Sequence, residues 1–184
     1  MNQENQENKT QPIKKTLLNK MMFDDITDYD DANSIVVLST NRMIELNLYK
    51  GDTVLLKGKK NKTTVAIILN NETQDDNLIK MNKCTRKNLR VRLGDCVHIS
   101  QYDEITNATK IHVLPLDDTI EGLSGNLFDV YLKPYFLNTF RPVSKGDLFL
   151  VHKAMHPVEF KIVSIEPNDY GIVSDETEIY CEGE

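Results

Sequence analysis

The chain has 184 residues, of which 28 are acidic and 22 basic, so its net charge near pH 7 is −6. Apolar residues make up 40% of it and tryptophan is absent, as in an ordinary soluble globular protein. The longest apolar run, Val65 to Leu69, is too short to cross a bilayer. The N-terminus lacks the apolar stretch of a secretory signal. We therefore expect an intracellular protein of one domain or two small ones.

Charge is distributed unevenly along the chain. Residues 1–20 are polar and rich in Asn, Gln and Lys, which predicts a flexible tail. Residues 21–107 carry 12 basic and 13 acidic side chains, whereas residues 108–184 carry 6 and 13. This shift predicts two units that divide near residue 107.

One short phrase occurs three times, at Gly51-Asp52, Gly94-Asp95 and Gly146-Asp147. In each copy the glycine can adopt a positive φ, the aspartate can hydrogen-bond the turn, and alternating apolar residues follow. The phrase therefore predicts a turn that enters a strand with one buried face. The spacings are too irregular for a solenoid and favour pseudo-symmetric barrel halves with a related third strand.

The remaining pattern is mostly that of strands. We expect strands over residues 34–38, 63–69, 111–114, 158–165 and 170–173, with a charged hairpin tip over residues 57–62. Residues 126–135 have helical spacing and predict a short helix, the main helical element, ending near Pro134. The predicted fold class is mainly β.

Motifs for nucleotide chemistry and acyl transfer are missing from the sequence. It contains no G-x-x-x-x-G-K-[ST] phosphate loop, no G-x-G-x-x-G and no G-x-S-x-G. The acidic residues Asp117, Asp118 and Glu121 lack an evident partner for proton transfer and are interpreted as a surface loop. We expect no catalytic residue and no cofactor in this chain, although a small barrel enzyme with a site assembled from distant residues is an open alternative.

A metal site has only weak support. His152 and His156 are four residues apart, a spacing that would place two imidazoles on one helix face. Pro157 and the surrounding β pattern favour two loop histidines instead. Cys84, Cys96 and Cys181 have neither disulfide nor metal-site spacing, so we expect isolated thiols.

A basic stripe offers an alternative function. It comprises Lys80, Lys83, Arg86, Lys87, Arg90 and Arg92. A nucleic-acid-binding β-barrel would place aromatic residues among these charges, but none occurs between Tyr49 and Tyr102. Docking on another protein surface is the other interpretation, and a salt titration separates the two because phosphate binding weakens steeply with salt.

Longer strings of the sequence resemble a known family. They are Gly51 to Lys60, Asn88 to Asp95, Ile111 to Pro115, Asp118 to Gly122, Gly125 to Phe128, Val130 to Phe136, Arg141-Pro142, Lys145 to Asp147 and Cys181 to Glu184. Together they resemble the N-terminal domain of the valosin-containing protein family of cell-division-cycle AAA+ unfoldases, from about Ile26 to the last residue. The resemblance implies a double-psi β-barrel through about residue 107, then a four-stranded β-barrel from about Lys110.

The resemblance also implies a function. In that family the domain lies at the rim of a hexameric ATPase ring and recruits ubiquitin-pathway adaptors, while ATP and Mg²⁺ bind in separate AAA+ modules. The implied partners are ubiquitin-regulatory X domains, Arg-rich helices, the ubiquitin-fusion-degradation adaptor and the ATPase modules themselves. A cytoplasmic protein is implied, with access to the nucleus and to the endoplasmic reticulum surface through adaptors, and a monomer is expected for this fragment.

The family's adaptor groove lies between its two subdomains. The matching positions are Ile35, Tyr49, Asp52, Ile67, Leu69, Leu137, Phe140 and Arg141. An apolar floor would remove a partner's anchor from water, and a carboxylate would pair with an arginine. Without the resemblance, Ile35, Ile67 and Leu69 would be interpreted as core strand residues.

Some positions depart from the family pattern. Ala32 stands where an acidic groove residue is common, and Phe140 replaces a usual tyrosine. His152 and His156 stand where arginines commonly face the ATPase module, and we expect Arg90 and Arg92 to face it as well.

Overall fold

The computed structural model describes residues 33–153 and 156–181. Strands predominate in these residues, which confirms the mainly β prediction. The predicted tail and Ala32 lie outside the described residues. The strands are β1 (Ile35–Ser39), β2 (Thr53–Lys57), β3 (Thr63–Asn71), β4 (Lys80–Met81), β5 (His98–Gln101), β6 (Lys110–Pro115), β7 (Arg141–Ser144), β8 (Leu148–Val151), β9 (Val158–Glu166), β10 (Tyr170–Val173) and β11 (Glu178–Cys181). The helical elements are α1 (Thr40–Glu45), η1 (Lys59–Asn61), α2 (Lys83–Leu89), α3 (Asp117–Ile120), η2 (Phe128–Leu132) and α4 (Lys133–Phe136).

The first unit is built on a five-stranded sheet with the order β4-β1-β3-β2-β5. β1 runs parallel to β3, and β3 pairs with β2 in an antiparallel hairpin whose tip is η1. Alternate residues of these strands point into one core, where Val36 and Ile68 are fully buried. The charged tip over residues 57–62 and the strand over residues 63–69 therefore lie where the sequence predicted.

The second unit combines a four-stranded sheet, β11-β6-β9-β8, with the two-stranded sheet β10-β7. Its core is aromatic: Phe149 stacks on Tyr135 at 5.2 Å and on Phe160 at 5.5 Å between ring centroids. η2 and α4 supply Tyr135 and its neighbours to this core. Offset stacked rings add to the hydrophobic gain from burying their area.

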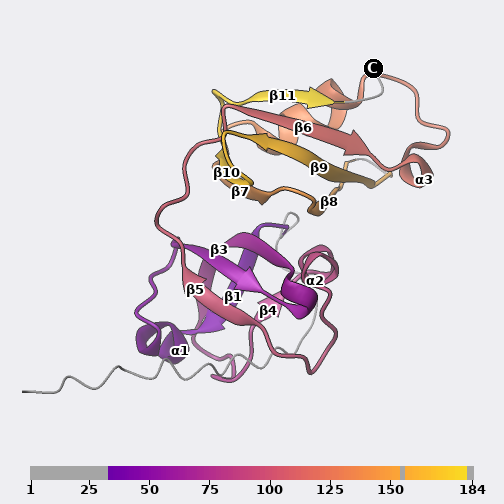
Figure 1. The fold of residues 1–184 in the computed structure, drawn as a ribbon. Helices are drawn as coiled ribbons and strands as arrows, with labels where there is room; N and C mark the ends of the chain where they lie inside the picture. Colours follow the sequence, from indigo (N-terminus) through magenta and orange to yellow (C-terminus); the bar gives the residue numbers. More distant parts are fainter. Residues whose placement is uncertain (1–32, 154–155, 182–184) are drawn as a thin grey trace, which may run out of the picture.

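The two units have separate cores. One hydrophobic cluster ends at Ile99 and the other begins at Ala108. Figure 1 shows the chain crossing between the units through the segment after β5. Within the described residues this segment is tied to the second unit by the bridge between Asn107 and Ile172.

The helices differ from the prediction in two respects. The predicted helix over residues 126–135 forms as a π turn, η2, followed by α4, and it continues past Pro134 to Phe136. Pro134 is tolerated because it lies in the first turn of α4, where an amide donor is least needed. Two other helices, α1 and α2, were missed.

Both missed helices are short and capped by side chains. Ser39 accepts a hydrogen bond from the Arg42 amide at the start of α1, and Asn82 accepts one from the Thr85 amide at the start of α2. Six and seven residues are too few to give a clear apolar period, so the caps were the available signals.

Candidate protein-binding groove

Two asparagine side chains hold the units together. β8 is the last strand of its sheet, and the Asn88 amide group bonds both the N–H and the C=O of Leu148, each at 2.9 Å. Asn33 bonds Leu150 in the same way, at 2.8 Å to the oxygen and 3.3 Å to the nitrogen. These amides take the place of a neighbouring strand at the exposed edge of β8.

A second set of contacts joins β3 to the sheet β10-β7. The Val65 amide donates to Ser144 Oγ at 3.1 Å, and the hydroxyls of Thr63 and Tyr170 lie 2.5 Å apart. Thr64 donates to the Asp147 carboxylate. These contacts involve only the first three residues of β3. The later residues of the strand, including Ile67 and Leu69, therefore lie beyond this junction.

The predicted groove floor lies on this outer face. Ile35 and Ile67 are register partners in β1 and β3, and Leu69 lies two residues further along β3. All three are half-buried, whereas the neighbouring Val36 and Ile68 fill the barrel core. Interpreting Ile35, Ile67 and Leu69 as core residues is therefore wrong, because they point away from the core.

Three other predicted groove residues have large apolar side chains that are exposed to solvent. Tyr49 is 66% exposed in the segment before β2, and Leu137 and Phe140 are 52% and 69% exposed between α4 and β7. A surface that gathers exposed aromatic and aliphatic groups is typical of a protein-binding site.

The polar groove residues are held by local bonds. The half-buried Asp52 accepts the Tyr49 amide at 2.8 Å. Arg141 donates from Nε to the Tyr135 carbonyl at 2.9 Å, and its guanidinium lies 4.0 Å from the centre of the Tyr135 ring. Arg141 thus packs on Tyr135 within the second unit.

Comparison with known families identifies the chain. The model for the N-terminal domain of cell division protein 48 (CDC48) matches residues 20–105. The model for domain 2 of CDC48 matches residues 122–184. The chain belongs to the CDC48 family. The two matches agree with a double-psi β-barrel followed by a small barrel, and both regions are non-catalytic in this family. N-terminal domains of CDC48 bind adaptors of the AAA+ protein.

Sequence reasoning missed one pocket of this CDC48-family chain. It has a volume of about 310 Å³ and adjoins Tyr49. Its apolar lining is Met43, Ile44 and Leu48, and Ile44 is 72% exposed at the rim. The cap at Ser39 could have revealed α1, which carries Met43 and Ile44.

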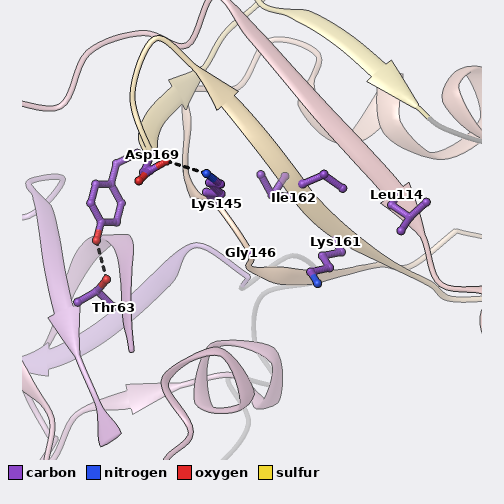
Figure 2. Close-up of a pocket in the computed structure, with 9 residues that line it drawn as sticks. Thr63, Leu114, Lys145, Gly146, Lys161, Ile162 and Asp169 are labelled. Carbon is purple, nitrogen blue, oxygen red and sulfur yellow. Dashed lines mark hydrogen bonds and ion pairs between the residues drawn. The ribbon is translucent and has the colours of Figure 1, made fainter. Parts of the chain in front are cut away.

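Another pocket, of about 570 Å³, lies elsewhere on the second unit and contains none of the predicted groove residues. Figure 2 shows Lys145 and Asp169 in its wall, with Thr63 of the first unit at its border. Lys145 Nζ and Asp169 Oδ1 lie 3.3 Å apart. Its charged residues, Lys145, Lys161 and Asp169, make it a poorer candidate for a protein anchor.

The basic stripe is divided by the fold. Lys87 forms a 2.8 Å ion pair with Glu159 across the two units, so part of the stripe is used within the molecule. Lys83, Arg90 and Arg92 are exposed, and Arg90 ends α2 with a left-handed φ of 55°. Arg90 and Arg92 lie in the segment that follows α2. Helix α2 itself packs against β8.

The weaker sequence candidates lie on the surface. His152 and His156 are exposed in the segment between β8 and β9, and the described residues there form no helix, so the helical spacing of two metal ligands does not apply. Within the described ranges no cluster of three or more potential ligands occurs. Asp117, Asp118 and Glu121 are exposed in or beside the single turn α3.

The cysteines in the described part of the chain form no disulfide. Burial raises the pKa of Cys84, and the nearby Glu159 charge adds to this effect. Within the described residues, no helix has both the length and the apolar character needed to span a membrane.

Proposed function

We propose that the surface formed by Ile35, Ile67, Leu69, Tyr49, Leu137 and Phe140 recruits adaptors of a hexameric, ubiquitin-dependent AAA+ segregase. The observation that carries the proposal is that exposed Tyr49, Leu137 and Phe140 accompany a half-buried apolar floor on β1 and β3. The family supports it, because its N-terminal domains bind adaptors. The proposed partners are ubiquitin-regulatory X domains and Arg-rich helices, with the ubiquitin-fusion-degradation adaptor a further partner of the same domain.

The chemistry of the groove suits such partners. An apolar anchor that covers Ile67 and Leu69 gains the free energy of removing both surfaces from water. Asp52 accepts one backbone bond from Tyr49, and a carboxylate has further acceptor sites for a partner's guanidinium. Hot spots of this kind place a charged pair beside a desolvated apolar centre.

A separate face is proposed for the ATPase modules. Arg90 and Arg92 follow α2, while His152 and His156 follow β8, the strand against which α2 packs. A guanidinium is positively charged and presents a planar fork of donors that matches a carboxylate. Contacts with the ATPase modules would therefore depend mainly on the arginines.

The test is an NMR titration of the full chain with a ubiquitin-regulatory X domain. Backbone amides near Ile35, Ile67, Leu69 and Phe140 are expected to shift. Phe140→Ala is expected to weaken binding at least about tenfold, since truncating a central aromatic anchor costs about 2 kcal/mol. Tyr180→Ala, which removes a 54% exposed aromatic residue from β11, is the matched control.

Ile67→Asp gives a stronger perturbation of the same surface. It places a carboxylate in the apolar floor, and we expect loss of binding with the fold retained because Ile67 points away from the core. Unchanged affinity in a folded Ile67→Asp variant would remove this residue from the site, and equal losses from Phe140→Ala and Tyr180→Ala would contradict the location of the groove.

A further inference from the structure

The three Gly-Asp turns have closely similar backbones. The amide of each aspartate donates to the carbonyl three residues earlier, at 3.0 Å for Asp52 and Asp95 and 3.1 Å for Asp147. The preceding glycines have φ of 96°, 87° and 88°. Each sequence thus forms a turn with glycine at its third position, the place where a positive φ is required.

The carboxylates of the first two turns close their own turns. Asp52 accepts the Tyr49 amide at 2.8 Å, and Asp95 accepts the Arg92 amide at 2.7 Å. Both bonds join the aspartate to the residue three positions earlier. An Asp in this phrase can therefore satisfy its carboxylate locally.

Asp147 instead makes its side-chain contact outside the turn. Its carboxylate accepts the hydroxyl of Thr64, a residue of β3 that is only 3% exposed. Ser144 Oγ lies 3.4 Å from Thr64 Oγ1 and accepts the Val65 amide at 3.1 Å. The carboxyl group thus ends a hydrogen-bond chain that runs from β3 through the turn between β7 and β8.

Asp147 borders a small cavity between the two units. Asp147 as a whole is half-buried because its turn lies at the surface, yet its side chain borders a cavity of only about 20 Å³ between the units. Such a volume holds about one water molecule. Burial raises the pKa of Asp147 to about 7, while the Thr64 hydrogen bond and the Lys62 charge lower it less.

The charged groups of the elements packed around Asp147 are mostly engaged elsewhere. Lys145 pairs with Asp169, Lys87 pairs with Glu159, Arg141 packs on Tyr135, and the Tyr170 hydroxyl meets Thr63. Lys161 of β9 is exposed, and Lys62 is the cation whose charge acts on the carboxylate among the described residues. An ionised Asp147 therefore has weak compensation where it lies.

We infer that Asp147 is a protonation-dependent latch between the two units: its neutral form keeps β7 against β3, and its ionisation loosens this junction and the groove beyond it. The proton exchanges with solvent, and no covalent step is involved. This inference rests on the function proposed for the groove, since it assigns regulation by pH to that site.

The junction connects directly to the groove. β3 carries Thr64 at the latch and Ile67 and Leu69 in the floor, while β7 begins at Arg141, directly after Phe140, which we call the wall of the proposed groove. An ionised carboxylate would draw water into the junction and separate the two strands there. The floor and the wall would then move apart, so a partner that spans both binds more weakly at high pH.

The first test follows the side-chain carboxyl carbon of Asp147 by NMR in the full chain, from about pH 2.5 to about pH 9. We expect a midpoint near 7, with the amides of Val65, Ile67 and Arg141 shifting at the same midpoint. Residual dipolar couplings, which report the relative orientation of the units, are expected to change with it. Asp147→Asn abolishes these changes, whereas Asp95→Asn, in a turn of the same backbone, retains them.

A midpoint near the ordinary value of 3.8, or a titration that leaves β3 and β7 unmoved, would overturn the latch. Asp147→Asn keeps the shape of the side chain and its acceptor for Thr64, and Thr64→Val provides a second variant. Thr64→Val removes the hydroxyl and is expected to raise the midpoint further, since that hydrogen bond lowers the pKa of Asp147.

The second test measures affinity for the ubiquitin-regulatory X domain on both sides of the midpoint. We expect binding about fivefold weaker at high pH, a coupling of ordinary size for two linked sites. Asp147→Asn is expected to bind equally at both pH values. Equal wild-type affinities despite a midpoint near 7 would refute the regulation and leave the proposed function intact. Absence of binding at every pH would refute the proposed function, and the NMR titration would still decide the latch.

Discussion

The turns at Gly51-Asp52 and Gly146-Asp147 share the Lys-Gly-Asp sequence and the backbone conformation, yet their carboxylates accept hydrogen bonds from different parts of the molecule. In both turns the glycine amide donates to a neighbouring strand, to Ile68 at 2.9 Å and to Ile162 at 2.7 Å. Asp52 then closes its own turn, whereas Asp147 reaches Thr64 of the other unit. Local sequence thus determines the turn, and the packing of the units determines the chemistry of its aspartate.

Asp95 completes the comparison because its pKa moves in the opposite direction. The hydrogen bond from Lys59 is the main cause that lowers the pKa of Asp95, and the Arg92 amide adds to it. Burial raises the pKa of Asp147. Two aspartates in matching turns are therefore expected to give the protein opposite responses to pH.

The largest expected effect comes from removing the titratable group of Asp147. Between pH 3.8 and about 7 the unfolded chain releases the Asp147 proton while the folded chain keeps it. Stability therefore falls as pH rises through this window, by about 1.4 kcal/mol per pH unit and by up to about 4 kcal/mol in total. Asp147→Asn is expected to remove this fall, as measured by urea unfolding across the window. A variant whose stability falls as steeply as that of the wild type would show that another group is responsible.

Asn88→Ala tests whether the contact between the two units causes the difference between Asp147 and the other two aspartates. It leaves the N–H and C=O of Leu148, next to Asp147, without their partner, and we expect a loss of about 2 kcal/mol. Water would then reach Asp147, so the pKa of Asp147 should fall toward its ordinary value. Asn70→Ala, which removes a single exposed hydrogen bond to Thr40, is the control. An unchanged Asp147 titration in Asn88→Ala would mean that the contact between α2 and β8 does not cause the raised pKa of Asp147.

Replacing Gly51 or Gly146 by alanine tests whether the two turns have the same backbone conformation. A Cβ at Gly51 or Gly146 would meet no atom within 4 Å, so the cost is that of the positive φ alone. We expect Gly51→Ala and Gly146→Ala each to lose about 1 kcal/mol in thermal unfolding. A clear difference between the two losses would show that the turns are not equivalent.

The smallest effect is expected at Asp95. Its lowered pKa means that the stabilisation is present above the ordinary value of 3.8 and is lost as pH falls through the lower, folded value. Asp95→Asn should remove this acid-side loss. Because the ion pair with Lys59 is exposed at the Lys59 end, the difference between wild type and variant should shrink in high salt. A difference that persists in high salt would point to the Arg92 amide bond instead.

Much of the fold was predictable because strand signals are local. The alternation of β3 and β9 follows from side chains that point to opposite faces, and β10 begins and ends where the sequence indicated. The short helices α1 and α2 were missed because their stability comes from capping and from packing on the barrel. For the groove, the positions came from the family resemblance, and the structure adds that Ile35, Ile67 and Leu69 face away from the core.

The sequence by itself determined the turns, most of the strands and the family, because these depend on φ preferences, on two-residue periodicity and on contiguous motifs. Only the tertiary structure decided which Asp is buried, since that depends on contacts between residues far apart in the chain. Asn33 and Asn88 pair with the edge of β8, and that docking places Asp147 against Thr64. Electrostatic free energy depends on distance and on exclusion of water, and neither quantity is encoded in the Gly-Asp phrase itself.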